Sequence, residues 1–217
     1  MRKIHNIIKR IFDFISAIIF IIVFAPILLF VAIAVKLDSK GPIIFKQLRL
    51  GKNGEEYFIF KFRSMILNAE NQGTGLFNYE NDPRVTKVGN FIRNTSLDEL
   101  PQVFNVLIGN MSFVGPRPPV NYELGNYKDF TGELKKRFRV KPGVTGYAQI
   151  NGRNEISWDE KIIFDNKYIE DFYKIGILLD IKIILITIIK VFKNEGGYEL
   201  EENSKVDQPR VINESKK

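Results

Sequence analysis

The sequence predicts a small, helix-rich α/β domain that carries an N-terminal re-entrant, proline-kinked membrane helix and interfacial amphipathic helices. Three observations lead to this fold class. Residues 14–35 form an apolar run without an ionisable side chain, residues 43–63 have an alternating pattern around a Gly-Lys-Asn-Gly turn, and residues 158–192 have helical patterns. With 217 residues, 45% of them hydrophobic, the chain can form one compact domain with its own core.

The composition limits the chemistry that the chain can perform. It has no cysteine, which excludes disulfides and thiolate chemistry, and its single histidine is His5 in the basic N-terminal run. A His-based catalytic triad or a His-ligated metal inside the domain is therefore excluded. The net charge of +7 predicts anionic partners, which could be nucleic acid, anionic lipid or phosphorylated substrates.

The apolar run at residues 14–35 predicts a membrane helix. Such a helix is about 33 Å long, enough for a bilayer core of ~30 Å. Pro26 lies near its middle, where a proline removes a backbone hydrogen bond and kinks the helix. Because both flanks are basic, the positive-inside rule favours a helix that breaks at Ala25-Pro26 and returns to the same side. A kinked spanning helix is the alternative.

The segments that follow are expected in this order. Residues 43–63 form two strands, and a helix runs from Arg63 to about Gln72. Residues 73–91 are turn-rich and end in a short helix. Ser96 and Glu99 have the spacing of a capping box, so a further helix is expected to begin there and continue through Pro101 to Gly109.

The C-terminal half is expected to be helical around a glycine-rich loop. Residues 122–140 and 158–174 have helical patterns, with the loop at 141–154 between them. Residues 175–192 form an apolar helix with a polar stripe of Asp180, Thr187 and Lys190, which suits either a core helix or an interfacial one. The polar tail at 194–217 has the composition of a disordered segment.

The adjacent acids Asp98 and Glu99 are the candidate site. Their ordinary interpretation is the capped first turn of a helix, where the helix dipole stabilises acidic side chains. However, a carboxylate in such a place can also hold Mg²⁺ against a diphosphate, or act as a nucleophile on phosphorus. Basic residues at turn-rich or element-end positions favour a phosphorylated substrate, and these are Lys61, Arg63, Arg84, Lys87, Arg93, Arg117, Lys141 and Arg153.

At these residues the chain resembles the bacterial sugar transferases, the small monotopic phosphoglycosyl transferases. The resemblance covers about residues 8–192. The motifs that carry it are "KRIFD", "GPIIFKQLRLGKNG", "FKFRSM", "NDPRVTKVGNFIRNTSLDELPQVFNVLIGNMSFVGPRP", "RVKPGVTGYAQINGRN" and "DNKYIEDFY…LDIKIILITI". One departure is Ala25-Pro26, where family members often carry Ser-Pro at the helix break.

The resemblance implies an enzyme that moves a hexose-1-phosphate from a UDP-sugar to polyprenyl (undecaprenyl) phosphate and releases UMP. Asp98 would attack the β-phosphate and carry the phospho-sugar, while Glu99 would help to hold Mg²⁺ or assist proton transfer. Arg93 matches a family arginine near the lipid phosphate, and other basic positions at the site are Lys61, Arg63, Arg117 and Arg153. Residues 1–37 would anchor the chain and residues 38–193 would form the catalytic domain.

The resemblance also implies a place in the cell and leaves rival functions to test. The catalytic domain would lie on the cytoplasmic face of the bacterial inner membrane, in the first membrane step of surface glycan synthesis. A nucleic-acid-binding protein is disfavoured, because the basic residues are scattered among turns instead of clustering with aromatic ones. A glycosyltransferase that releases UDP and an inactive membrane-attached scaffold remain as alternatives. UDP-glucose, UDP-galactose and UDP-linked N-acetylated or diacetylated amino-sugars are all compatible donors, and the sequence has no heptad pattern that would predict an oligomer.

Overall fold

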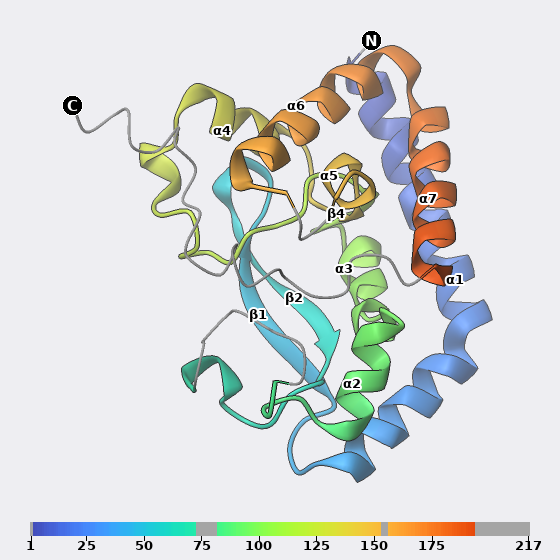
Figure 1. Ribbon diagram of the computed structural model, residues 1–217. Coiled ribbons are helices and arrows are strands. Elements are labelled where there is room, and N and C mark those ends of the chain that lie inside the picture. The colour runs from blue at the N-terminus through green and yellow to red at the C-terminus, as the bar shows by residue number, and fades with distance from the viewer. Residues whose placement is uncertain (1, 73–81, 153–155, 194–217) are drawn as a thin grey trace.

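The computed structural model describes residues 2–72, 82–152 and 156–193. Arg153 and the polar tail lie outside the described residues. A β-hairpin lies at the centre, and helices cover it along one side and at one end (Figure 1). The elements, in chain order, are α1 (Arg2–Asp38), β1 (Ile44–Leu50), β2 (Glu56–Phe62), α2 (Lys87–Asn94), α3 (Gln102–Ile108), β3 (Ser112–Val114), α4 (Gly132–Lys136), β4 (Gly143–Thr145), α5 (Tyr147–Ile150), α6 (Trp158–Ile175) and α7 (Ile177–Phe192).

The predicted hairpin is confirmed. Strands β1 and β2 pair in antiparallel fashion, and a short 3₁₀ helix over Lys52–Gly54 joins them where the Gly-Lys-Asn-Gly turn was expected. Asn53 has φ 57°, a left-handed conformation that asparagine tolerates better than most residues. The register pairs Arg49 with Tyr57 and Phe45 with Lys61. These side chains therefore share one face of the hairpin, because directly opposite residues point the same way.

A second pair of strands lies next to the hairpin. Strands β3 and β4 are parallel, with Ser112 opposite Gly143 and Val114 opposite Thr145. The approach is close enough that a Cβ on Gly143 would lie 2.1 Å from the backbone nitrogen of Gly115. This pairing replaces part of the loop that was expected at residues 141–154.

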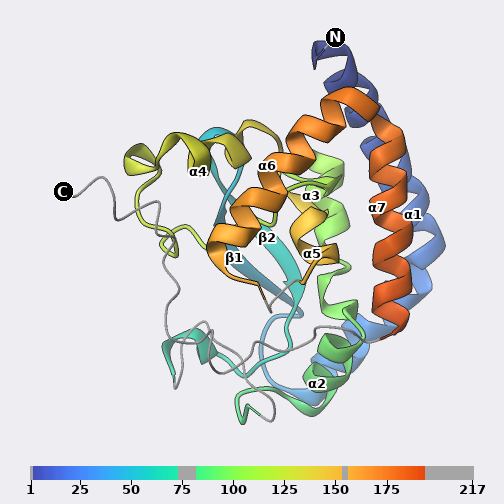
Figure 2. The same cartoon turned by 45° about the horizontal axis from the view of Figure 1, so that its top comes forward.

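Helix α1 lies along one side of the domain and contacts it near both of its ends (Figures 1 and 2). Near the N-terminus, Lys9 forms a buried ion pair with Asp180 of α7. Arg10 donates to the last carbonyls of α3, at 2.7 Å from Val106 O and 2.8 Å from Leu107 O. Near the C-terminus, the carboxylate of Asp38 accepts from the backbone nitrogen of Val88 at 3.0 Å.

The expected break at Ala25-Pro26 does not interrupt the helix. Pro26 lies inside α1, which continues to Asp38, although the helix axis visibly changes direction along its length in Figure 1. A proline inside a helix bends the axis without ending it when the turns on either side stay hydrogen-bonded. Among the described helices, α1 is the one long and apolar enough to cross a membrane, and most of its apolar stretch is exposed.

Helix α7 turns its polar stripe inward. Asp180 is buried, and Thr187 shares a hydrogen bond of 2.7 Å with Thr145 of β4. Most of the outward side chains are large and apolar, although Lys182 is also exposed; the apolar ones are Leu178, Ile181, Leu185, Ile188, Ile189 and Val191. The helix therefore buries Asp180 in the domain and leaves a mostly apolar face outside.

Three other expectations are corrected. Residues 63–72 do not form an α-helix, since Met65 bridges to Val85 as an isolated strand-like pair and only Ala69–Asn71 forms a 3₁₀ turn. Residues 122–140 are helical only in short pieces around α4. The helix expected at Ser96 begins instead at Gln102. The capping box that the structure does contain joins Ser157 to Glu160 at the start of α6, whose extent confirms the helix expected at 158–174.

Candidate active site

The two acids lie in a tight turn between α2 and α3. Ser96 has φ 56°, so it ends α2 in a left-handed conformation and makes no capping bond. Residues Leu97–Glu99 form one 3₁₀ turn. Pro101 directly precedes α3, a position that suits proline because the N–H groups at the start of a helix have no intrahelical acceptor. The predicted capping box of Ser96 and Glu99 is wrong. Glu99 is bound by other groups, and Asp98 is buried with 9% of its surface exposed.

Two cations hold the carboxylate of Glu99. Its Oε1 atom accepts from Lys61 Nζ at 2.9 Å and from Arg117 Nη2 at 3.1 Å. Lys61 comes from β2, and Arg117 comes from the Gly-Pro-Arg-Pro loop after β3. Both cations are thus placed beside the acidic turn, although each is far from it in the sequence.

Burial and charge act in opposite directions on these cations. Burial lowers the pKa of Lys61, and this effect outweighs the attraction of Glu99 and Asp98, which favours the charged form. For Arg117 the nearby Glu99 is the largest influence and raises the pKa further. The surroundings therefore favour the charged form of Arg117 and disfavour that of Lys61.

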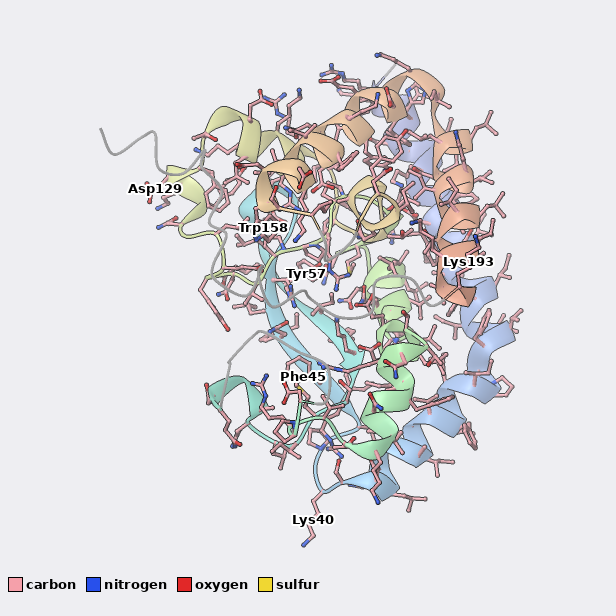
Figure 3. All side chains as sticks on the ribbon, viewed as in Figure 1. Lys40, Phe45, Tyr57, Asp129, Trp158 and Lys193 are labelled. Atoms are coloured by element: carbon pink, nitrogen blue, oxygen red, sulfur yellow. The ribbon has the colours of Figure 1, made fainter. Side chains whose placement is uncertain are left out.

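The hairpin contributes two residues that the sequence analysis missed as site residues. Arg49 donates from Nη1 to the carbonyl of Pro118 at 2.9 Å, next to Arg117 in the chain. Tyr57 lies near the middle of the molecule in Figure 3, and its buried hydroxyl has no hydrogen-bond partner among the described residues. Burial raises the pKa of Tyr57, so its hydroxyl remains protonated. Arg49 and Tyr57 lie on the same face of the hairpin as Lys61, and this strand alternation was the signal that could have identified them.

The remaining predicted phosphate-binding residues are not all in this cluster. Arg63 donates to Ser39 O at 2.6 Å and to Val35 O at 3.2 Å, so its guanidinium binds carbonyls at the end of α1. Arg93, in the last turn of α2, donates from Nε to Ser64 Oγ at 2.8 Å. Arg63 therefore has a structural role. The side chain of Arg93 is held by Ser64, in the segment that follows β2.

The acidic pair has the right chemistry for Mg²⁺. In the described part of the chain, no three His, Asp or Glu side chains gather as a ready-made metal site. Mg²⁺ in phosphate chemistry is usually held by one or two carboxylates together with substrate oxygens and waters. Asp98 and Glu99, adjacent in one turn beside two cations, fit that requirement.

Together, the fold and the site define a class: an α/β protein with a long apolar helix and a buried acidic pair set among cations suited to phosphate. The particular family follows from comparison with known proteins. Residues 4–194 match the sequence profile described as "Bacterial sugar transferase", and the chain belongs to that family.

Several relatives have names that include undecaprenyl phosphate. The chain is 44% identical over 200 residues to "UDP-glucose:undecaprenyl-phosphate glucose-1-phosphate transferase" of Escherichia coli (strain K12), an alignment that covers 90% of this chain and 42% of the relative. The protein of the same name from Klebsiella pneumoniae is 46% identical over 203 residues, covering 91% and 43%. "Uncharacterized sugar transferase EpsL" of Bacillus subtilis (strain 168) is 42% identical over 190 residues, covering 88% and 90%. The chain thus spans less than half of the first two relatives.

Proposed function

We propose that the chain transfers a hexose-1-phosphate from a UDP-sugar to polyprenyl phosphate and releases UMP. The observation that carries the proposal is the acidic turn, where Lys61 and Arg117 hold Glu99 beside the buried Asp98. Phosphoryl transfer depends mainly on positioning and on neutralising charge on oxygen, and this cluster supplies both without histidine or cysteine. The names of the relatives support the acceptor and the kind of group transferred.

In the proposed reaction Asp98 is the nucleophile. A carboxylate oxygen of Asp98 attacks the β-phosphorus of the UDP-sugar, the bond from that phosphorus to the bridging oxygen breaks, and UMP leaves with the oxygen. An oxygen of polyprenyl phosphate then attacks the same phosphorus and releases the Asp98 carboxylate. Lys61 and Arg117 neutralise the phosphate oxygens during both steps. When bound by Asp98 and Glu99, Mg²⁺ would add positive charge against the diphosphate.

We further propose that α1 is re-entrant and that the domain lies on the cytoplasmic face of the inner membrane. Lys9 and Asp38, near opposite ends of the helix, both contact the same compact domain. A spanning helix would put its two ends on opposite sides of the bilayer, where one domain could not contact both. The apolar outer side of α7 supports a domain that rests against lipid. A single Cys at Ile4 tests this: labelling in intact cells by an impermeant reagent would contradict it.

Nucleotide release tests the reaction. Purified chain in lipid nanodiscs is given a panel of UDP-sugars, polyprenyl phosphate and Mg²⁺, and the released nucleotide is identified. We expect UMP from the wild type and none from Asp98→Asn, while the exposed control Asp129→Asn, at the outer edge of the molecule in Figure 3, keeps the wild-type rate. Release of UDP would indicate ordinary glycosyl transfer, and no release from any donor would favour the inactive scaffold. The active donor identifies the sugar.

A further inference from the structure

The loop that carries Arg117 has few backbone donors of its own, although Gly115 N donates to Thr145 O at 2.8 Å. Pro116, Pro118 and Pro119 surround Arg117, and a proline has no N–H to donate. Residues 116–119 therefore depend mainly on donors from elsewhere in the fold, which bind their carbonyl oxygens. Since Arg117 must reach Glu99 at 3.1 Å, whatever fixes these carbonyls also sets the geometry of the acidic turn.

Each of the four consecutive carbonyls of residues 116–119 accepts one hydrogen bond from outside the loop. Two come from backbone nitrogens and two from arginine side chains. The donors to the four carbonyls in order are Gly143 N at 2.9 Å, Arg137 Nη2 at 2.7 Å, Arg49 Nη1 at 2.9 Å and Leu50 N at 3.1 Å. The bond from Arg137 goes to the carbonyl of Arg117 itself.

Arg137 is itself held rigidly. Its Nε and Nη2 atoms bind Asp165 Oδ2 of α6 at 2.9 and 2.8 Å, and both side chains are almost fully buried. Its guanidinium also lies over the rings of Phe138 and Trp158, at 5.3 and 5.1 Å from their centroids. A buried arginine with this many fixed contacts has little freedom, so it can transmit the position of α6 to the loop.

We propose that Arg137, oriented by Asp165, is a positioning residue that sets the guanidinium of Arg117 against Glu99 in the active site. The inference rests on the proposed function, because it assigns Arg137 a role in the same reaction. Arg137 does not touch the acidic turn. It acts through Nη2, which bridges Asp165 Oδ2 and the Arg117 carbonyl. Lysine or methionine at this position has no planar fork to make both bonds.

A double-mutant cycle separates positioning from general stability. The full chain in nanodiscs is compared as wild type, Arg137→Met, Arg117→Ala and the double variant, with kcat/KM for UMP release as the readout. Because a misplacement of about 1 Å can cost roughly 100-fold, we expect Arg137→Met to lower kcat/KM by roughly 10- to 100-fold. In the Arg117→Ala background the same change should cost less than about threefold. Equal losses in both backgrounds would overturn the proposal.

A spectroscopic readout makes the test independent of activity. The ¹⁵N signal of the Arg117 side-chain Nε–H, assigned by its loss in Arg117→Lys, should shift or broaden in Arg137→Met. An unchanged signal would overturn the proposal. If the wild type releases no UMP from any donor, the proposed function fails, and this signal alone still decides whether Arg137 positions Arg117.

Two further variants guard against misfolding and chance effects. If Arg137→Met does not fold, Asp165→Asn removes the orienting charge without changing the side-chain shape. It should change the Arg117 signal and kcat/KM in the same direction as Arg137→Met would. No change in either would contradict the proposal. The matched control is Lys136→Met, which breaks the neighbouring, more exposed pair with Glu170. Since such pairs are worth little, the control should keep kcat/KM within about twofold of wild type.

Discussion

The ion pair between Lys9 and Asp180 is the contact to break in order to test how firmly the N-terminal half of α1 is held. The Asp180 side chain is 1% exposed and that of Lys9 is 11% exposed. Asp180 also accepts from Tyr168 Oη at 2.9 Å, and this hydroxyl lies 3.2 Å from the Val114 carbonyl. Removing Lys9 would leave a buried carboxylate with one neutral donor.

The expected magnitude follows from the burial of the pair. Breaking a buried pair by removing one partner costs about 3–5 kcal/mol, so Lys9→Met should lower the free energy of unfolding by about that amount. In a domain of this size each kcal/mol shifts Tm by about 2–4 °C, which gives a fall of roughly 6–20 °C. Lys9→Met combined with Asp180→Leu removes both charges, and it should recover most of the loss because Tyr168 can still bind the Val114 carbonyl.

Denaturation in detergent micelles, followed by circular dichroism, measures these differences. Lys3→Met is the matched control, since Lys3 is an exposed lysine in the same helix and should change Tm by no more than about 2 °C. A loss below about 1 kcal/mol for Lys9→Met would refute the reasoning. A double variant no more stable than the single one would show that the cost is not that of an unpaired charge.

Three further predictions follow from other contacts. Lys61→Met removes a cation that binds Glu99 and should lower the rate of UMP release roughly 100- to 1000-fold. Lys46→Met, on the opposite face of the hairpin, should leave that rate unchanged, and equal effects of the two changes would contradict the site. Burial raises the pKa of Asp165 from 3.8 to about 6, so as the pH falls the folded protein takes up this proton before the unfolded chain does. This carboxyl therefore adds stability as the pH falls from about 6 towards 4, and Asp165→Asn should remove that slope from denaturation curves measured across pH. Gly89→Ala would place a Cβ 1.9 Å from the Ser64 carbonyl oxygen and should cost about 1–3 kcal/mol or more in the same denaturation assay, where an unchanged midpoint would contradict the close packing.

Local patterns predicted the parts of the fold that depend on neighbouring residues. The alternation at residues 43–63 and the glycines of the turn gave the hairpin, and the polar–apolar pattern at 158–174 gave α6. Asp98 and Glu99 were found as an acidic pair, and Lys61 and Arg117 as basic residues that the family resemblance assigns to the same site. The structure joins Glu99 to both cations, as that interpretation requires.

Long-range contacts explain what the sequence patterns could not predict. The spacing of Ser96 and Glu99 is that of a capping box, yet Glu99 binds two cations that are far away in the chain, and Ser96 adopts a left-handed conformation. Arg63 was grouped with the phosphate ligands on its charge, although its guanidinium binds carbonyls at the end of α1. A charge pattern does not reveal which partner a long side chain will reach.

The pairing of Lys9 with Asp180 also means that α1 is synthesised on the ribosome well before the helix that binds it, α7. The two residues are 171 positions apart, and at ~5–20 residues per second the second emerges about 9–34 s after the first. During that interval the apolar helix α1 exists without its partner on α7. Its exposed apolar side chains must be covered, by lipid or by a chaperone, until the domain that finally binds the helix has been made.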